Sequence, residues 1–286
     1  MILIDYSQIV ISNAMMHLQS EKNKSIDIDL LRHMILNSIR GLISKNRSIY
    51  GSDIVLAVDG RNSWRKSVFP LYKKGRKKAK EESDIDWDSL YSAMDTIKNE
   101  LIEYSHYRVI QLEECEADDI IAILSQLYAA HQKILIVSGD SDFHQLQIHE
   151  NIHQYSPTLK KHTKLSKQQA RIALKHKIIC GDKGDGIPNF LSVDNSFTDN
   201  IRQKSITQKN LDKWLNMENE LFCVTGEMQR NWARNKMLID FDEIPNSIRE
   251  KVINTYNMIQ VKSKKSLVKY FMEKQLVNLL ECIDEF

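Results

Sequence analysis

Short apolar segments, separated by longer amphipathic ones, constrain the fold of this chain more than any other feature of its sequence. Residues 2–5, 54–58 and 134–137 are continuously apolar and rich in β-branched residues, as expected for strands buried in a parallel sheet. A fourth strand is expected over 107–112, and the pattern over 152–155 is a weaker indication of a fifth. Between them, apolar residues recur at three- and four-residue steps over 28–45, 87–104 and 116–130, which predicts helices. This alternation predicts an α/β fold with a mostly parallel central sheet flanked by helices.

The sequence beyond about residue 165 is mainly helical in pattern. Helices are expected over 166–179, 209–221, 227–238, 246–258 and 264–281. We therefore predict two parts: an α/β body over 1–165 that carries the chemistry, and a helical region over 166–286 packed on it.

Composition and cysteine spacing narrow the class of protein. With 42% hydrophobic residues in 286, the chain can bury a sizeable core, and its net charge of +2 does not by itself indicate a nucleic-acid partner. The four cysteines are Cys115, Cys180, Cys223 and Cys282. None belongs to a C-x-x-C pair or has zinc-finger spacing to a histidine, so we expect no disulfide framework and no zinc site. The N-terminal sequence lacks the pattern of a signal peptide, so we expect a cytoplasmic protein without a membrane span.

Acidic residues follow three of the predicted strands. Asp5, Asp59 and Asp140 come at or just after strand ends. Because the carboxyl ends of parallel strands meet at one edge of a sheet, where ligands bind, we expect these carboxylates to lie close together. Further acids that could join them are Glu116, Asp118, Asp119, Asp142, Asp182 and Asp185.

Each of these acids alone has an ordinary structural interpretation. An aspartate after a strand often caps a helix or forms a turn, and acids in a first helical turn interact favourably with the helix dipole. Together, however, carboxylates gathered at one edge repel one another unless divalent cations neutralise them. Oxygen ligands without His or Cys favour Mg²⁺ or Mn²⁺ over zinc. Two such ions can activate water and stabilise the leaving oxygen of a phosphodiester, so the pattern predicts hydrolysis of phosphodiesters.

Basic residues concentrate in two segments that contain no acid. Residues 61–80 hold nine Lys or Arg with three aromatic residues interleaved. Such a segment can bind phosphates and stack on bases, and its place directly after Asp59 would put it over the acidic edge. Residues 158–181, which include Lys177, form the second segment and could bind a duplex backbone. For both segments the alternative is an ordinary solvated basic helix or linker.

Six motifs occur in a characteristic order along the chain. They are Ile4-Asp5, Ala57 to Asp59, Trp64 to Arg76, Glu116 to Asp119, Ser138 to Leu146 and Gly181 to Pro188. Together they resemble the flap endonuclease / 5′-exonuclease family, and its phage members most of all. The resemblance implies a PIN-like 5′-nuclease core with a basic arch segment over about 61–83, followed by a helical DNA-binding region. It also implies two Mg²⁺ ions, for which Mn²⁺ can substitute.

The resemblance implies a role for each matching residue. The metal-binding acids would be Asp5, Asp59, Glu116, Asp118, Asp119, Asp140, Asp142, Asp182 and Asp185, the last two completing an outer site. The catalytic residues that contact the scissile phosphate would be Lys73 and Arg76. Nucleic-acid contacts would come from Arg65, Lys66, Tyr72, Lys74, Lys77, Lys78 and Lys183. For Asp119, helix capping is an equal alternative.

The same resemblance implies an activity and partners. The expected protein is a 5′→3′ exonuclease and flap endonuclease that removes RNA primers and adjacent DNA during phage replication, by two-metal phosphodiester hydrolysis. Its substrates would be DNA and RNA–DNA duplexes with 5′ ends, nicks or flaps. It would act as a monomer, with a single-stranded-DNA-binding protein as a partner. Two alternatives are a non-catalytic nucleic-acid-binding protein on the same scaffold and a phosphatase or phosphotransfer enzyme of a doubly wound fold.

One segment departs from the family pattern. Family members usually follow Gly-Ile-Pro with the glycine-rich turn of a helix–hairpin–helix that grips the duplex backbone. Here the residues from Asn189 to Ser196 include no glycine. We therefore expect altered duplex binding at this point, and any potassium site there is in doubt.

Overall fold

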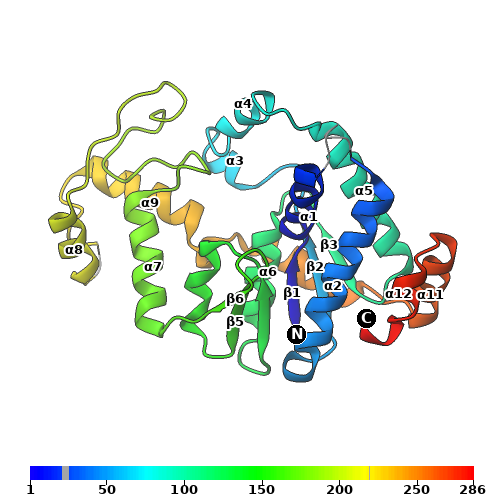
Figure 1. The fold of residues 1–286 in the computed structure, drawn as a ribbon. Helices are drawn as coiled ribbons and strands as arrows, with labels where there is room; N and C mark the ends of the chain where they lie inside the picture. The colour runs from blue at the N-terminus through cyan, green and yellow to red at the C-terminus, as the bar shows by residue number, and fades with distance from the viewer. Residues whose placement is uncertain (21–25, 219) are drawn as a thin grey trace.

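A six-stranded sheet forms the centre of the computed structural model, which describes residues 1–20, 26–218 and 220–286 (Figure 1). The strands are β1 (Ile2–Asp5), β2 (Ile54–Val58), β3 (Arg108–Gln111), β4 (Ile134–Val137), β5 (Ile152–Ser156) and β6 (Lys161–Thr163). Their order is β3-β2-β1-β4-β5-β6; the first five run parallel, and β6 pairs antiparallel with β5. The predicted α/β fold is confirmed. The edge strand β6 is absent from the prediction because its three residues are all polar.

The strand order places a topological switch point beside β1. This strand pairs with β2 on one side and β4 on the other, with Asp5 level with Ala57 and Ile4 level with Val137. Ligands of open α/β sheets bind at such a point, beyond the carboxyl ends of the strands. The ends of β1, β2 and β4 therefore define where a site is to be sought.

Helices cover both faces of the sheet. They are α1 (Tyr6–Ser20), α2 (Ile28–Tyr50), α5 (Trp87–Tyr104), α6 (Ala117–Tyr128) and α10 (Asn246–Met258). Ile2 and Ile4 of β1 share one apolar core with α1, α2 and α5, whereas Leu3 shares another with α6 and α10, as the two-residue period of a strand requires. None of the helices in the described ranges is long and apolar enough to cross a membrane.

The arch segment, residues 61–83, lies beyond the carboxyl edge of the sheet, at the top of Figure 1. It contains the short helices α3 (Arg65–Val68) and α4 (Gly75–Glu81). At its start, the Trp64 backbone N–H donates to the Glu114 carbonyl at 3.0 Å, in the loop that leads into α6. The base of the arch is therefore joined directly to the acidic edge.

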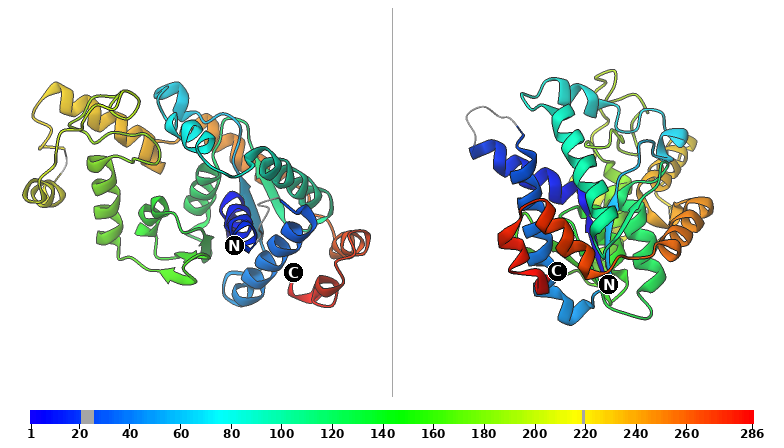
Figure 2. Two further views of the ribbon diagram at one scale, coloured as in Figure 1. Left: turned by 45° about the horizontal axis from the view of Figure 1, so that its top comes forward. Right: turned by 90° about the vertical axis from the view of Figure 1, so that its right-hand side faces the viewer.

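The C-terminal half builds a third apolar core, and the chain then ends beside α5 and α2. Its further helices are α7 (Lys167–Cys180), α8 (Gln208–Asn216), α9 (Gly226–Ile239), α11 (Lys264–Glu273) and α12 (Val277–Leu280). The chain also contains three short 3₁₀ helices among the described residues: η1 (Ser141–Ile148), η2 (Phe241–Glu243) and η3 (Ile283–Glu285). Phe190 and Trp232 are central to the third core, with α7, α8 and α9 around them. The last two helices instead pack against α5 and α2, where Tyr270 and Phe271 are buried. Figure 2 shows these C-terminal helices, in red, on the opposite side of the molecule from α8.

Three helices differ from the sequence-based prediction. The helix expected over 264–281 is interrupted between α11 and α12, where Gln275 adopts a left-handed backbone (φ 56°). The helix expected over 209–221 ends at Asn216, because Met217 is extended. Helix α1 is absent from the prediction because its apolar residues fall in consecutive runs, 9–11 and 14–16, and not at three- and four-residue steps.

Candidate active site

Four aspartates at the switch point form one half of the site, and we call them the inner acids. They are Asp5, Asp59, Asp118 and Asp140. Asp5 ends β1, Asp59 follows β2 and Asp140 follows β4, while Asp118 lies in the first turn of α6. Four segments far apart in the sequence thus each bring one carboxylate to the same edge.

Asp5 and Asp59 of the inner acids accept hydrogen bonds from uncharged groups. Asp5 accepts from the Ser138 hydroxyl at 3.3 Å, in addition to a backbone N–H at 3.0 Å. Asp59 accepts from the Ser7 hydroxyl at 2.8 Å and from the Ala117 backbone N–H at 2.9 Å. No described lysine, arginine or histidine forms an ion pair with any of the four. Lys73 lowers the pKa of Asp118 without pairing with it, but burial and the charges of Asp5 and Asp140 outweigh that effect.

The inner acids consequently repel one another. Burial, together with the charges of Asp59 and Asp140, raises the pKa of Asp5 to about 7. Burial and the charges of Asp5 and Asp140 raise the pKa of Asp118 well above its ordinary value. Full ionisation at neutral pH therefore needs an added positive charge, and this oxygen-only donor set fits a hard divalent cation. As the side chains stand, no three described His, Cys, Asp or Glu residues are close enough to form a metal cluster.

Four further acids face the arch segment and α7, and we call them the outer acids. They are Glu116, Asp142, Asp182 and Asp185. Each is ion-paired within the chain: Glu116 with Arg65 and Lys73, Asp185 with Lys73 and Arg76, and Asp142 and Asp182 both with Lys177. All four line one small pocket with Asp118, which therefore borders both halves of the site.

The ion pairs reverse the electrostatic effect of burial on the outer acids. Burial alone would raise the pKa of Glu116, but the charges of Lys73 and Arg65 outweigh it and hold that pKa below its ordinary value. Burial would likewise raise the pKa of Asp182, and Lys177 outweighs it in the same way. These two outer acids are therefore stabilised as carboxylates without any bound ion.

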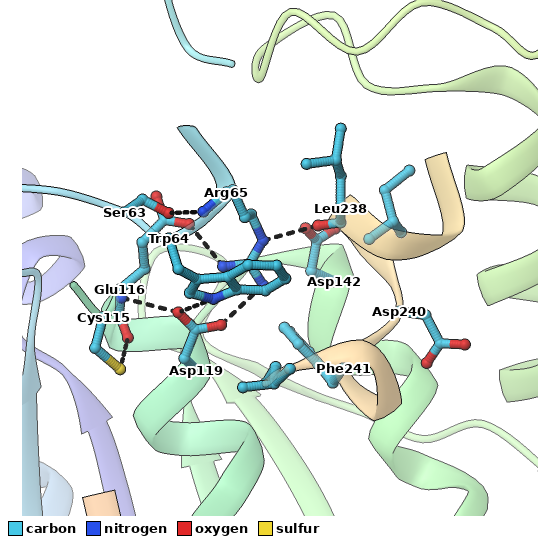
Figure 3. A network of polar contacts seen from close by, with 12 residues as sticks. Ser63, Trp64, Arg65, Cys115, Glu116, Asp119, Asp142, Leu238, Asp240 and Phe241 are labelled. Carbon is cyan, nitrogen blue, oxygen red and sulfur yellow. Dashed lines mark hydrogen bonds and ion pairs between the residues drawn. The ribbon is translucent and has the colours of Figure 1, made fainter. Parts of the chain in front are cut away.

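A buried network fixes Glu116 in place (Figure 3). Arg65, which is 3% exposed, pairs with Glu116 at 3.0 Å and with Asp119 at 2.8 Å, and its Nε donates to the Leu238 carbonyl at 2.8 Å. Asp119 is fully buried and also accepts from the Trp64 indole N–H at 3.2 Å. The predicted roles of Arg65 in nucleic-acid binding and of Asp119 in metal binding do not fit this burial. The capping alternative does fit, because Asp119 forms a capping box with Glu116 at the start of α6.

The arch residues expected at the scissile phosphate are engaged by outer acids. Lys73 pairs with Glu116, and Arg76 Nη2 lies 2.6 Å from Asp185 Oδ1. The buried Tyr72 hydroxyl lies 2.9 Å from both acids, so its predicted contact with nucleic acid would require it to leave them. The Lys73 backbone N–H also donates to the Asp185 carbonyl at 2.8 Å, from a left-handed conformation (φ 56°). The arch segment is thus closed onto the outer half of the site.

The other predicted nucleic-acid contacts are accessible where the structure describes them. Lys66, Lys74, Lys77 and Lys183 are exposed. The side chain of Lys78 lies outside the described part of the chain. Exposed lysines of this kind can bind phosphate without first breaking a buried contact.

A tight loop presents Asp182 and Asp185. Gly181 ends α7 with φ 71°, and a Cβ added there would lie 2.3 Å from the Ile187 carbonyl oxygen. Asp182 and Ile187 exchange two backbone hydrogen bonds of 2.8 Å, and the Asp185 N–H donates to Asp182 Oδ1 at 3.0 Å. Glycine at position 181 is therefore needed for the loop that carries these two outer acids.

Side chains of α9 hold Pro188 and the glycine-free segment that follows it. Asn235 Nδ2 and Arg234 Nη2 donate to the Pro188 carbonyl at 2.9 Å and 3.1 Å, and Arg234 also pairs with Asp194 at 2.5 Å. The sequence gives no sign of the roles of Arg234 and Asn235, because their partners lie forty or more residues earlier in the chain. Lys177, expected on a duplex-binding surface, instead lies between Asp142 and Asp182.

Comparisons with known sequences connect these features to a family. Residues 1–177 match the model of the 5′-3′ exonuclease N-terminal resolvase-like domain, and residues 168–286 match that of the T4 RNase H C-terminal domain. The chain is 33% identical to ribonuclease H of Enterobacteria phage T4, over 99% of this chain and 95% of that protein. It is 28% identical to the flap endonuclease Xni of Shewanella piezotolerans, over 63% of this chain and 69% of that protein.

Solved structures agree on the fold. A complex of the bacteriophage T5 flap endonuclease with DNA and metal ions superposes with a TM-score of 0.62 at 16% identity, covering 90% of this chain and 99% of that one. The T5 5′-exonuclease with bound zinc gives a TM-score of 0.60 at 16% identity, covering 96% and 98%. At this identity the likeness establishes the fold alone. From the sequence matches, the chain belongs to the 5′–3′ exonuclease family of 5′-nucleases.

Proposed function

We propose that this protein is a magnesium-dependent 5′→3′ exonuclease and flap endonuclease that removes RNA primers and adjacent DNA during phage replication. One observation carries the proposal: four inner acids, none ion-paired with a described residue, lie at the switch point beneath a basic arch segment. That combination suits a site that takes up divalent cations and a phosphodiester together. The names of the relatives, ribonuclease H and flap endonuclease, support the choice of substrate.

The inner acids would hold the first Mg²⁺, and the outer acids would complete the second site. Bound ions of this type activate water and stabilise the leaving oxygen of a phosphodiester. Within the chain, Arg65 and Asp119 would act as positioning residues, because they lock Glu116 at the junction of the two halves. Ser7 and the Ala117 N–H would orient Asp59 in the same manner.

Lys73 and Arg76 would bind the scissile phosphate. Both now neutralise outer acids, so a phosphate that carries its own negative charge competes for the same cations. Arg76 is the more accessible, with its side chain 53% exposed against 17% for Lys73. We therefore expect Arg76 to meet the incoming strand first and Lys73 to complete the contact.

The wider assignment follows from this site. We propose residues 1–165 as the catalytic body and 166–286 as the helical region that binds duplex DNA, with the exposed arch lysines contacting single strands. DNA and RNA–DNA duplexes with 5′ ends, nicks or flaps would be the substrates, acted on by a monomer in the cytoplasm of the host cell. A single-stranded-DNA-binding protein would be the partner at the replication fork.

Cleavage of defined substrates tests the function. Nicked, flapped and RNA–DNA duplexes with a 5′ label are incubated with Mg²⁺, with Mn²⁺ or with EDTA, using wild type, Asp142→Asn and the exposed control Glu150→Gln. We expect short 5′ products from wild type and the control, none in EDTA, and at least a hundredfold loss in Asp142→Asn. Equal cleavage by wild type and Asp142→Asn, or cleavage that persists in EDTA, contradicts the assignment. Binding of DNA without any cleavage would favour a non-catalytic protein.

A further inference from the structure

One lysine side chain lies where two acids of the outer half approach each other. Lys177 Nζ is 2.8 Å from Asp182 Oδ2 and also forms an ion pair with Asp142. All three side chains are mostly buried, with exposed fractions of 19%, 24% and 18% for Lys177, Asp182 and Asp142. Lys177 thus links Asp142, which lies in η1, to Asp182, which lies in the loop after α7.

Local backbone geometry creates this contact. Lys177 lies in the last turn of α7, and its carbonyl accepts from the Gly181 N–H at 2.8 Å. The left-handed conformation of Gly181 then reverses the chain and brings Asp182 back over that turn. Helix α7 packs along η1, which presents Asp142 from the other side. The lysine is therefore held in the gap by the fold and not by a flexible surface contact.

The position of the ammonium group matters because of what else would bind there. Two carboxylates from different segments, facing each other across a small gap, are the ligands a hard divalent cation takes. A lysine ammonium carries one charge, whereas such a cation carries two, and both need the same oxygens. The ammonium and the cation therefore exclude each other from Asp142 and Asp182.

We propose that Lys177 is an internal counter-ion that competes with the divalent cation of the outer half. In the metal-free protein it holds Asp142 and Asp182 together, and it must leave them when the cation binds. No described lysine or arginine forms an ion pair with an inner acid, so the two halves fill in sequence, inner before outer, as the metal concentration rises. This inference rests on the proposed function, since it concerns the metal sites of the nuclease.

Metal titration of the DNA-free protein tests the proposal. Mn²⁺ is added to wild type and to Lys177→Met, and binding is followed by calorimetry and by the electron paramagnetic resonance of free Mn²⁺. We expect wild type to show one tighter and one weaker site, and Lys177→Met to bind the weaker site at least tenfold more tightly. Lys177→Arg, which keeps the positive charge, should retain the weak site.

Thermal unfolding supplies a second readout that does not depend on cleavage. Without metal, Lys177→Met should melt at a lower temperature than wild type, because Asp142 and Asp182 then repel each other unshielded. Saturating Mn²⁺ should raise its melting temperature by more than it raises that of wild type, since ligand that binds the folded state more tightly stabilises it more. Lys177→Gln, which keeps a hydrogen-bond donor on a slightly shorter side chain, serves if the methionine variant does not fold in EDTA.

A lysine on the same helix provides the matched control. Lys167 begins α7 and pairs with the exposed Glu150 at 2.9 Å, so Lys167→Met removes a charge and an ion pair away from the site. Its Mn²⁺ affinity and metal-linked melting shift should equal those of wild type. If Lys167→Met and Lys177→Met change the Mn²⁺ affinity equally, the effect comes from the overall charge of the protein, and the proposal is overturned.

The outcomes separate this proposal from the proposed function. If wild type cuts DNA with Mg²⁺ but Lys177→Met and Lys177→Gln bind Mn²⁺ no more tightly than wild type, Lys177 is not a competitor and only this inference falls. Weaker Mn²⁺ binding in those variants would show that the lysine supports the site instead of opposing it, with the same consequence. If wild type cuts no substrate under any metal condition, the proposed function falls instead.

Discussion

The inner and outer acids occupy one edge of one sheet, yet their charges are balanced in opposite ways. Among the inner acids, Asp5 and Asp59 accept hydrogen bonds from hydroxyl and backbone N–H groups, and none of the four forms an ion pair with a described residue. The outer acids are paired with four cations of the chain, Arg65, Lys73, Arg76 and Lys177. Burial raises the pKa of Asp5 and Asp118, whereas the paired cations lower the pKa of Glu116 and Asp182.

This difference separates the half that a bound ion would stabilise from the half that the chain stabilises itself. The inner carboxylates repel one another, so the proposed cation would stabilise them in the charged form at neutral pH. The outer acids are assembled by the chain itself, and ligands must displace internal cations to reach them. Inner substitutions should therefore act mainly on activity, and substitutions among the buried partners of the outer acids mainly on stability.

Removing an inner acid should have the largest effect. Asp5→Asn deletes a carboxylate from the half that depends on bound ions, and we expect kcat/KM on a nicked duplex to fall on the order of 10⁴-fold. The metal-free protein should not be destabilised, because the substitution relieves repulsion with Asp59 and Asp140. Single-turnover cleavage and urea unfolding in EDTA measure the two effects. If Asp5→Asn is markedly less stable than wild type in EDTA, the inner acids do not differ from the outer acids in the way proposed.

Breaking the buried network of the outer half should mainly lower stability. Arg65→Met leaves Asp119 buried without its ion-pair partner and weakens the hold on Glu116, so we expect the free energy of unfolding to fall by about 3–5 kcal/mol. Urea unfolding measures this, with the exposed neighbour Lys66→Met as the control, for which a change within about 0.5 kcal/mol is expected. If Arg65→Met unfolds like Lys66→Met, the network does not hold the outer half together.

An exposed arch cation should have an intermediate effect, on activity alone. Arg76→Met removes a proposed phosphate contact, and we expect kcat/KM to fall by about 10²-fold. Its pair with Asp185 is half exposed, so the free energy of unfolding should change by less than about 1 kcal/mol. Steady-state cleavage and urea unfolding of the same preparation test both statements. If Arg76→Met loses as much stability as Arg65→Met, Arg76 stabilises the fold in the way that the buried Arg65 does, which contradicts this prediction.

Much of the fold could be predicted because its strongest signals are local. The strands 2–5, 54–58 and 134–137 occur with the predicted bounds, since each is a continuous apolar run between polar segments. Elements without such a signal were not predictable. Strand β6 is wholly polar, and the interruption at Gln275 depends on a backbone conformation that no neighbouring residue indicates.

The acids of the site could be predicted from the sequence, but the cations that pair with them could not. Strand ends locate Asp5, Asp59 and Asp140, because parallel topology brings such ends together. The pairing of Lys177 with Asp142, and of Arg65 with Asp119, depends on contacts between elements that are distant in sequence, so charge counts cannot reveal it. The same lysine can lie on a solvated face or among acids, and only packing decides which.

The exposed arch lysines should have the smallest effect, and they complete the comparison because no acid of the site engages them. Lys74 is exposed and forms no ion pair with a described residue, so it is free to meet a phosphate without exchanging partners. We expect Lys74→Ala to weaken DNA binding to a similar extent for all sequences and to reduce the slope of log Kd against log salt by about 0.9, the value for one phosphate contact. Cleavage at saturating substrate should stay unchanged, in contrast to Arg76→Met. Fluorescence anisotropy over a salt series, with Ca²⁺ in place of Mg²⁺, measures the slope. If Lys74→Ala instead lowers the cleavage rate and leaves the slope unaltered, Lys74 has the same role as Arg76. Exposed arch cations would then not differ in function from those paired with the outer acids.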